Sequence, residues 1–382
     1  MIRQLSYLSA LFIFVFLGFV GCSSKPDIHR NIYFKRSWSR TTVSPQYLGY
    51  RPPAMITPVV MDEKVITGNG VDGVMAFSKK SGHMIWQKPI RNGAEGVFAD
   101  SKSGVFLGAN DGKFYYLNPE NGKTQWSYSL GSESTSAPLV RGNFVYHVAG
   151  NGAFYCLEKE SGRVLWVKTR PPKDAITIRG TTPPVFADGK VFVGFSDGYF
   201  VAYNATDGGI VWEKKLSDNK KFNDVDAKPA LTETCIIVAN YADSLYCLDK
   251  ANGQIRWQLN EGGSSQPIYV SGSDVIYSTE SAILIVDVNS GKPRKRWNID
   301  KKWGQPTMAT PYKNWLVFAL SDGPVVLMDR DTGAWDDTFY TGRGVSAAPT
   351  VLESGEVYII SNQANIYKLN IGSVDKNKTW GL

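Results

Sequence analysis

Two stretches of this sequence combine charged and aliphatic residues in a way that could bind a partner. The first reads Ile176-Thr177-Ile178-Arg179-Gly180, and the second reads Asn223-Asp224-Val225-Asp226. Exposed isoleucines beside a guanidinium, next to a loop with two carboxylates, would form a docking surface for another protein. Alternatively, Arg179 pairs with Asp224 or Asp226 and braces two long loops. The residues leave both interpretations open, and the two are compatible.

Metal and nucleophile chemistry find little support in the residue pattern. The three histidines are His29, His83 and His147, and none has a potential metal-ligand partner two to four residues further along. Asp224 and Asp226 could imitate a site for a hard cation, but two carboxylates on an exposed loop fall short of the six to eight oxygen ligands that Ca²⁺ takes. No Ser or Cys stands in a recognisable nucleophile setting. We therefore expect no metal, no cofactor and no catalytic residues.

The N-terminus carries a chemistry of its own. An apolar stretch from Leu5 to Val20 follows Arg3 and has the proportions of a secretory signal, which we place at residues 1–21. It ends Phe19-Val20-Gly21-Cys22, which resembles the lipobox of bacterial lipoproteins with Phe in place of the usual Leu. The resemblance implies acylation of Cys22, a tether over residues 22–31 and, because Ser23 rather than Asp follows, the outer membrane. Acyl chains on Cys22 would hold the protein at the membrane, because each methylene buried in the bilayer contributes roughly 0.8 kcal/mol to membrane binding.

An internal repeat dominates the rest of the chain and must position these candidates. Its unit runs from an Asp-Gly or Asn-Gly pair, through a second Gly, to a Trp, as in Asp111-Gly112, Gly122 and Trp126. The Trp positions are Trp86, Trp126, Trp166, Trp212, Trp257 and Trp297. A period of about 40 residues with four strand-like runs is typical of a β-propeller. We expect the Gly of each pair and its neighbour to take positive φ in a two-residue hairpin, and the Trp to fill the gap between blades.

The repeat count predicts an all-β, eight-bladed propeller of four-stranded antiparallel blades over residues 32–371. A seventh copy is degenerate, with Trp335 off register, and an eighth from Ser346 lacks its Trp strand. The segment Tyr33–Trp38 can supply that strand and close the ring, which removes an open sheet edge. The tail at residues 372–382, including Trp380, fits no repeat.

The cysteines within the repeat are expected to be structural. Cys156 and Cys247 occupy the same point of the unit, where sister copies have Ala76 and Ala202, so the slot is small and buried. The register inferred for this hairpin does not place Cys235 opposite Cys247, and no disulfide is predicted.

The two candidate stretches lie where the repeat is interrupted. The repeat Trp is followed by a Pro just before the next inner strand. The separation is 12 positions after Trp126, but 18 after Trp166 and 17 after Trp212. Two consecutive blades thus carry insertions at the same point, so their loops are expected to be neighbours on one face, where binding functions concentrate.

With the lipobox and the eight repeats, the two loops resemble the BamB family, lipoproteins of the β-barrel assembly machine. The family's aliphatic–x–aliphatic–Arg–Gly run is matched by Ile176, Ile178, Arg179 and Gly180, with Ile in place of Leu twice. Its Asp–Val–Asp run is matched by Asp224 to Asp226. The resemblance implies a scaffold, not an enzyme. It further implies contact with the periplasmic POTRA domains of BamA and a role in folding and inserting outer-membrane proteins. Whether it touches those unfolded proteins directly is left open by the sequence.

Two other function classes remain as alternatives. A quinoprotein dehydrogenase shares the repeat, but this chain lacks the adjacent cysteines of the alcohol dehydrogenases. A cell-surface or polysaccharide-binding propeller, unrelated to barrel assembly, would expose aromatic residues around the ring mouth. The net charge of +7 is spread among acidic residues without a dense basic run, and so does not indicate nucleic acid.

Overall fold

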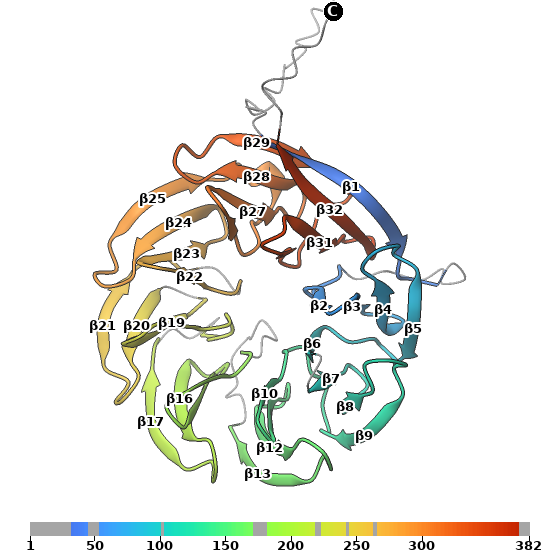
Figure 1. Ribbon diagram of the computed structural model, residues 1–382. Coiled ribbons are helices and arrows are strands. Elements are labelled where there is room, and N and C mark those ends of the chain that lie inside the picture. The colour runs from blue at the N-terminus through green and yellow to red at the C-terminus, as the bar shows by residue number, and fades with distance from the viewer. Residues whose placement is uncertain are drawn as a thin grey trace, which may run out of the picture.

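The fold is a ring of eight β-sheets. A computed structural model describes residues 32–44, 53–100, 103–170, 182–217, 223–241, 244–262 and 266–373, without the side chains of residues 99 and 100. Each sheet is a four-stranded antiparallel meander, and the sheets surround a central axis (Figure 1). The predicted eight-bladed propeller is confirmed. A short 3₁₀ helix, η1 (Lys301–Trp303), interrupts the strands, and no helix in these ranges is long and apolar enough to cross a membrane.

The blades are numbered along the chain, and their strands run from the axis outward. Blade 1 contains β2 (Val59–Met61), β3 (Lys64–Asn69), β4 (Gly73–Ser78) and β5 (Met84–Pro89); blade 2 contains β6 (Gly96–Asp100), β7 (Gly104–Gly108), β8 (Lys113–Leu117) and β9 (Thr124–Ser129). Blade 3 contains β10 (Leu139–Arg141), β11 (Phe144–Val148), β12 (Ala153–Glu158) and β13 (Val164–Thr169); blade 4 contains β14 (Val185–Ala187), β15 (Lys190–Gly194), β16 (Tyr199–Asn204) and β17 (Ile210–Lys215).

The second half of the ring follows the same plan. Blade 5 contains β18 (Ala230–Leu231), β19 (Cys235–Ala239), β20 (Leu245–Asp249) and β21 (Ile255–Leu259); blade 6 contains β22 (Tyr269–Ser271), β23 (Asp274–Ser278), β24 (Ala282–Asp287) and β25 (Pro293–Asn298). Blade 7 contains β26 (Thr310–Tyr312), β27 (Trp315–Ala319), β28 (Val325–Asp329) and β29 (Trp335–Phe339); blade 8 contains β30 (Thr350–Val351), β31 (Glu356–Ile360), β32 (Asn365–Ser373) and β1 (Ile32–Thr41).

Blade 8 closes the ring with strands from both ends of the chain, as predicted. β1 pairs antiparallel with β32 from Ile32 opposite Ser373 to Thr41 opposite Asn365 (Figure 1). β32 thus continues two residues into the segment that was expected to be tail. The pairing gives the last blade its outer strand.

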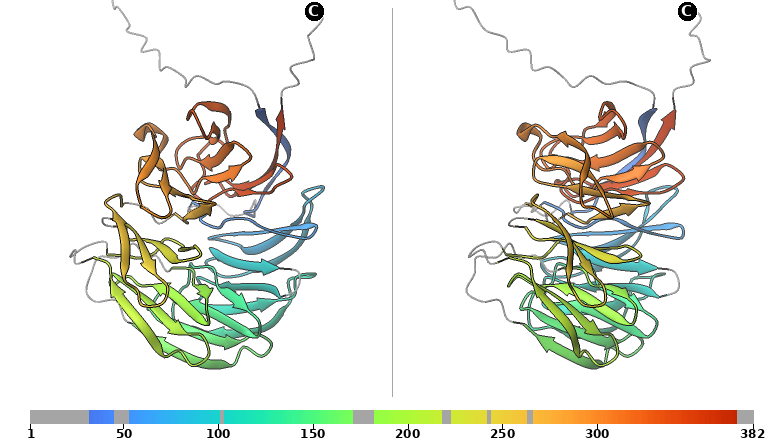
Figure 2. Two further views of the ribbon diagram at one scale, coloured as in Figure 1. Left: turned by 60° about the vertical axis from the view of Figure 1, so that its left-hand side comes forward. Right: turned by 90° about the vertical axis from the view of Figure 1, so that its left-hand side faces the viewer.

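The meander gives the ring two different faces, which Figure 2 shows from the side. The connections from the fourth strand of one blade to the first strand of the next lie on one face, together with the turns between second and third strands. We call this the inter-blade face. The turns between first and second, and between third and fourth strands, lie on the other face, the hairpin face.

The turns between second and third strands differ from the prediction in detail. Gly112, Gly152 and Gly198 take φ values of 82°, 77° and 86°. Their Asp or Asn neighbours do not have positive φ. Ala109 pairs with Lys113 across Gly112, so the loop has three residues and a single left-handed position. That geometry is a type I turn followed by a bulge, not a two-residue hairpin.

The conserved spacing of Trp and Gly within the repeat serves a contact between neighbouring blades. Trp86 of blade 1 donates its Nε1 hydrogen to the carbonyl of Pro119 in blade 2 at 2.9 Å. Its ring covers Gly122, where a Cβ would lie 2.6 Å from the indole. Gly122 also has φ of 68°, which L side chains rarely adopt. The same Trp–Gly contact joins Trp38 to Gly82, Trp126 to Gly162, Trp166 to Gly208, Trp212 to Gly253 and Trp257 to Gly291.

Blade 6 departs from this plan, although the sequence counted Trp297 as a regular copy. Trp297 lies two residues past the expected register, opposite Ile283, and Lys295 takes the Trp position. The Nζ of Lys295 donates to the carbonyl of Arg330 at 3.0 Å, the bond that an indole makes elsewhere. The displaced ring of Trp297 still reaches Gly333 of blade 7.

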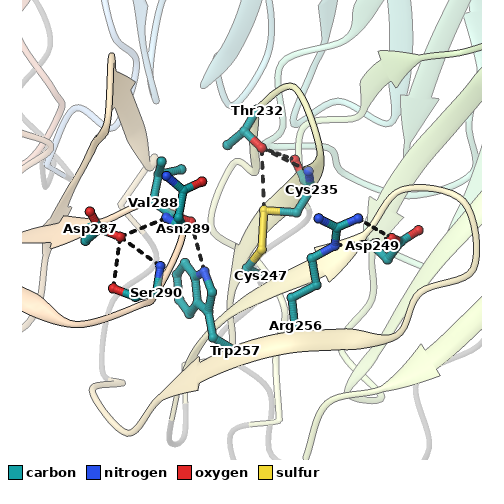
Figure 3. Close-up of a disulfide and its surroundings, with 10 residues drawn as sticks. All are labelled: Thr232, Cys235, Cys247, Asp249, Arg256, Trp257, Asp287, Val288, Asn289 and Ser290. Carbon is teal, nitrogen blue, oxygen red and sulfur yellow. Dashed lines mark hydrogen bonds and ion pairs between the residues drawn. A yellow bond between two sulfur atoms is a disulfide. The ribbon is translucent and has the colours of Figure 1, made fainter.

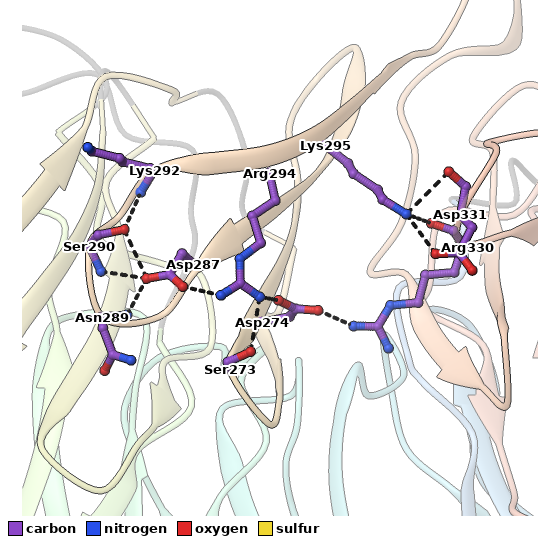
Figure 4. Close-up of polar contacts among 10 residues, drawn as sticks. All are labelled: Ser273, Asp274, Asp287, Asn289, Ser290, Lys292, Arg294, Lys295, Arg330 and Asp331. Carbon is purple, nitrogen blue, oxygen red and sulfur yellow. Dashed lines mark hydrogen bonds and ion pairs between the residues drawn. The ribbon is translucent and has the colours of Figure 1, made fainter.

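A chain of ion pairs accompanies this altered junction (Figure 4). Arg294 pairs with both Asp274 and Asp287 within blade 6. Asp274 also accepts from Arg330 of blade 7 at 2.5 Å, and Lys295 pairs with Asp331 at 2.8 Å. Charged groups thus fasten the two blades at the hairpin face.

Cys235 and Cys247 form a disulfide that the sequence did not predict. Their Cα atoms lie 5.7 Å apart, within the usual range for a disulfide. The inferred register was correct, because Ile237 and not Cys235 stands opposite Cys247. Residues two apart on one strand face the same side, so the bridge forms along the diagonal (Figure 3). Cys156 is a buried free thiol, as expected.

We predict that Gly122→Ala destabilises the protein more than Gly142→Ala. Both glycines have positive φ, but a Cβ at Gly142 meets no atom within 4 Å. Each variant therefore has a strain cost of about 1 kcal/mol, and only Gly122→Ala adds about 1–3 kcal/mol of overpacking against Trp86. Urea unfolding measures both. Equal loss in the two variants would contradict the packing role of the Trp–Gly contact.

We predict that loss of the disulfide lowers the free energy of unfolding by about 2–4 kcal/mol. The comparison is wild type, Cys235→Ala/Cys247→Ala and the free-thiol control Cys156→Ala, each unfolded in urea with and without dithiothreitol. Reductant should lower the midpoint of wild type and of Cys156→Ala, but leave the double variant unchanged. An unchanged wild type would show that the bridge adds no stability.

Candidate functional site

The segment Asn223–Asp226 is held in place by its backbone where blade 4 passes to blade 5. Asn240 Nδ2 donates to the carbonyl of Asn223 at 2.8 Å, and the Tyr241 amide donates to the carbonyl of Asp224 at 3.0 Å. The Val225 amide donates to the carbonyl of Phe195 in blade 4 at 3.3 Å. The segment is therefore tied to both blades on the inter-blade face.

Asp224 and Asp226 are buried, which corrects the expectation of carboxylates on an exposed loop. Asp224 is 0% exposed and Asp226 is 6% exposed. Burial raises the pKa of Asp226 to about 7, and the charge of Asp224 raises it further, while the amides of Asp226 and Ala227 oppose the rise. These carboxylates do not form a charged outer surface; they lie inside the wall of the ring.

Polar groups around the pair add to its negative character. The Tyr241 hydroxyl donates to Glu280 at 2.7 Å. The pKa of Tyr241 is raised to about 12 by burial, by this bond, and by the charges of Glu280 and Asp226. Burial also raises the pKa of the Tyr277 hydroxyl, and Asp226 and Glu261 contribute to that rise. Such a site favours either a proton on Asp226 or a cation close to the pair.

Ile176, Ile178 and Arg179 lie outside the described residues, as does Cys22. The structure does show both flanks of their segment. Thr182, the first described residue after it, donates its hydroxyl to the carbonyl of Val225 between the two aspartates. The prediction that the two long loops are neighbours on one face is supported at this point.

The other flank is fixed by Arg170, which sequence reasoning did not single out. Its guanidinium bonds Asp197 at 2.5 Å and Glu213 at 2.8 Å, both in blade 4. It also lies 4.0 Å above the ring of Tyr199. Nothing in the repeat distinguishes Arg170 or Thr182 from other polar residues, because their partners come from the next blade.

His147 is a scaffold residue. It lies fully buried in β11, with Nε2 at 2.6 Å from the hydroxyl of Ser134. Burial lowers the pKa of His147 to about 3, so the ring is neutral at physiological pH. Within the described ranges, no group of three or more His, Cys, Asp or Glu side chains could hold a metal ion.

Together, the fold and this site define an eight-bladed β-propeller of the pyrroloquinoline-quinone repeat type, with a buried carboxylate pair where two consecutive long inter-blade connections meet. A family model described as outer membrane protein assembly factor BamB matches residues 70–298. This covers more than half of the sequence, and the chain belongs to that family.

Similar proteins include outer membrane protein assembly factors BamB of two bacteria. The one from Yersinia pestis is 24% identical over 370 residues, 91% of this chain and 92% of its own length. The one from Burkholderia pseudomallei is 25% identical over 371 residues, 92% of this chain and 94% of its own length.

Solved structures show the fold alone. BamB from Moraxella catarrhalis aligns with a TM-score of 0.75 at 18% identity, over 88% of this chain and 99% of that one. A quinohemoprotein alcohol dehydrogenase from Comamonas testosteroni aligns with a TM-score of 0.73 at 14% identity, over 91% of this chain and 78% of that one. The same ring therefore carries unrelated functions.

We predict that Asp226→Asn gains stability over wild type as the pH rises from about 4 to 8. The pKa of Asp226 in the folded protein, about 7, lies above its ordinary 3.8. The folded state therefore binds more protons than the unfolded state in this window, and the contribution of Asp226 falls as the pH rises. The difference between the variants should change by at most about 4 kcal/mol.

Wild type and Asp226→Asn must be compared at each pH, because His147 changes the free energy of unfolding in the opposite direction between pH 3 and 6.5. Its lowered pKa makes stability rise with pH there, and it does so equally in both proteins. Urea unfolding at several pH values gives the difference. An Asp226→Asn variant that is less stable than wild type at pH 8 would instead show that a cation, as in the bracing interpretation, neutralises the carboxylate.

Proposed function

We propose that this protein is a noncatalytic scaffold in the assembly of outer-membrane proteins. The observation that carries the proposal is family membership, together with relatives named as assembly factors that align along more than nine-tenths of this chain. The alternative dehydrogenase function rests on likeness of fold, which the propeller shares with the assembly factors.

The proposed location is the periplasmic face of the outer membrane. Cys22 would carry the acyl chains, and residues 22–31 would connect them to β1. β1 starts at Ile32 on the hairpin face, because it runs as the fourth strand of blade 8 toward the inter-blade face. An anchor there leaves the inter-blade face turned away from the bilayer and open to a periplasmic partner.

The proposed partner is BamA, bound through its POTRA domains by Ile176, Ile178, Arg179, Asp224 and Asp226. Burial changes the role assigned to the two aspartates. The buried aspartates would support the segment around Val225, whose carbonyl accepts the hydrogen bond from the Thr182 hydroxyl. Ile176, Ile178 and Arg179 would make the direct contact with BamA. This combines the two interpretations of the sequence, since bracing of the loops prepares the docking surface.

The test is a pull-down with the periplasmic part of BamA from the same organism, comparing wild type with Arg179→Ala and Asp224→Ala. We expect each substitution to weaken recovery at least tenfold, a loss of about 1.4 kcal/mol or more. Arg256→Ala is the matched control, because Arg256 pairs with Asp249 on the hairpin face. Equal recovery of all four proteins would overturn the assigned face.

The enzyme alternative has a separate test. The protein is mixed with pyrroloquinoline quinone and Ca²⁺ and then freed of unbound cofactor. A retained quinone absorbance band would favour the dehydrogenase class, and an absence of the band agrees with a scaffold.

A further inference from the structure

Three aromatic side chains gather at the junction of blades 6 and 7, away from the carboxylate pair. The ring of Trp303 lies 6.3 Å from that of Trp335 and 6.4 Å from that of Tyr340, between centroids. Tyr340 is 59% exposed, and the two tryptophans are half-buried. We call these three residues the aromatic patch. Exposed Trp and Tyr on a firm base are the side chains that most often dominate protein interfaces.

The patch exists because Trp335 is not used to join blades. In a regular blade the Trp covers a glycine in the turn between the third and fourth strands of its neighbour. Blade 8 has no such turn, since its third strand, β32, and its fourth, β1, come from opposite ends of the chain. Blade 7 therefore has no glycine to cover, and Trp335 lies off register and contacts Trp303.

The backbone beneath the patch is well fixed. The carbonyl of Trp303 accepts from the Asp322 amide at 3.1 Å, which joins η1 to the turn after β27. Asn362 Nδ2 donates to the carbonyl of Ser321 at 2.8 Å and to that of Arg343 at 3.1 Å, so it ties this turn to the connection after Tyr340. A surface ordered in this way loses little conformational entropy when it binds.

The rim of the patch carries excess positive charge. Lys301 and Arg343 are exposed and form no ion pair with any described residue. Lys302, by contrast, pairs with Asp300 at 2.9 Å and lies over the ring of Trp303. Asp322 adds one exposed carboxylate, so the rim retains a net cation. Its complement is a surface with carboxylates beside an apolar anchor.

We infer that the aromatic patch binds a segment of a partner protein in which a large apolar or aromatic side chain is flanked by carboxylates. The anchor packs on Tyr340 and Trp303, and the carboxylates meet Arg343 and Lys301. A membrane is a poorer occupant, because Trp303 and Tyr340 lie in inter-blade connections while β1 starts at the opposite face. The site is separate from Asp224 and Asp226, so it goes beyond the proposed function.

The test uses three fluorescently labelled nine-residue peptides with blocked ends. The first alternates Glu and Phe, the second has Ala for each Phe, and the third has Lys for each Glu. Fluorescence anisotropy should show that wild type binds the first and neither of the others. Tyr340→Ala should weaken that binding at least tenfold, and Lys301→Glu/Arg343→Glu should shift the preference to the Lys peptide.

Two variants serve as controls. Tyr33→Ala removes an aromatic side chain that is 38% exposed in β1 on the hairpin face, and it should bind as wild type does. Asp226→Asn should also bind the peptide normally, so a failure of the BamA proposal is distinguishable from a failure of this one. Binding that survives both Tyr340→Ala and the charge reversal would overturn the inference. The inference would also be overturned if wild type bound none of the peptides but bound anionic phosphatidylglycerol vesicles in a way that depends on Tyr340. Self-association of the protein through the patch would overturn it as well.

Discussion

The ring depends on one contact, an indole of one blade that covers a glycine of the next. The contact needs three conditions at once: a flat apolar surface, an indole N–H that reaches a turn carbonyl, and a turn residue without a Cβ at positive φ. Trp86 on Gly122 meets all three. Since a blade buries its flat sides only against its neighbours, the repeated sequence follows from the repeated contact. Trp38 shows this most clearly, because its strand β1 joins blade 8 from the opposite end of the chain to the other three strands, and its ring still covers Gly82 of blade 1.

The two exceptions to this contact lie at consecutive junctions, between blades 6 and 7 and between blades 7 and 8. Blade 8 offers no turn between its outer strands, so the junction with blade 7 uses other means. Asp337 of β29 accepts a hydrogen bond from the Phe34 amide of β1 at 2.7 Å, and Phe339 meets Tyr367 edge-on at 5.5 Å between ring centroids. One junction earlier, Lys295 and its ion pairs supplement a displaced Trp297. The ring closure accounts for the irregular Trp335 of blade 7, and ion pairs accompany the irregular Trp297 of blade 6.

The carboxylate pair imposes a different constraint. A buried, ionised Asp226 beside Asp224 opposes folding unless a proton or a cation compensates it. The backbone of the segment Asn223–Asp226 is nevertheless held from both sides. Asn240 and Tyr241 of blade 5 donate to it from one side, and Thr182, which precedes blade 4, donates from the other. A costly group kept in a fixed place is the usual mark of a functional site, and it lies where the sequence carries its two consecutive insertions.

Much of this protein was determined by the sequence alone, because its main contacts recur at a fixed spacing. The Trp and Gly positions predicted eight blades, and the orphan Trp38 predicted the closing strand. Local spacing also located the two long connections and the Asp224–Asp226 stretch. Burial of those aspartates was not predicted, because their surroundings come from β15, β19 and the segment at Thr182, which are distant in sequence. The Cys235–Cys247 bridge depends on a diagonal across two strands. The aromatic patch depends on where the chain ends meet in the ring, and that meeting exists only in the folded structure.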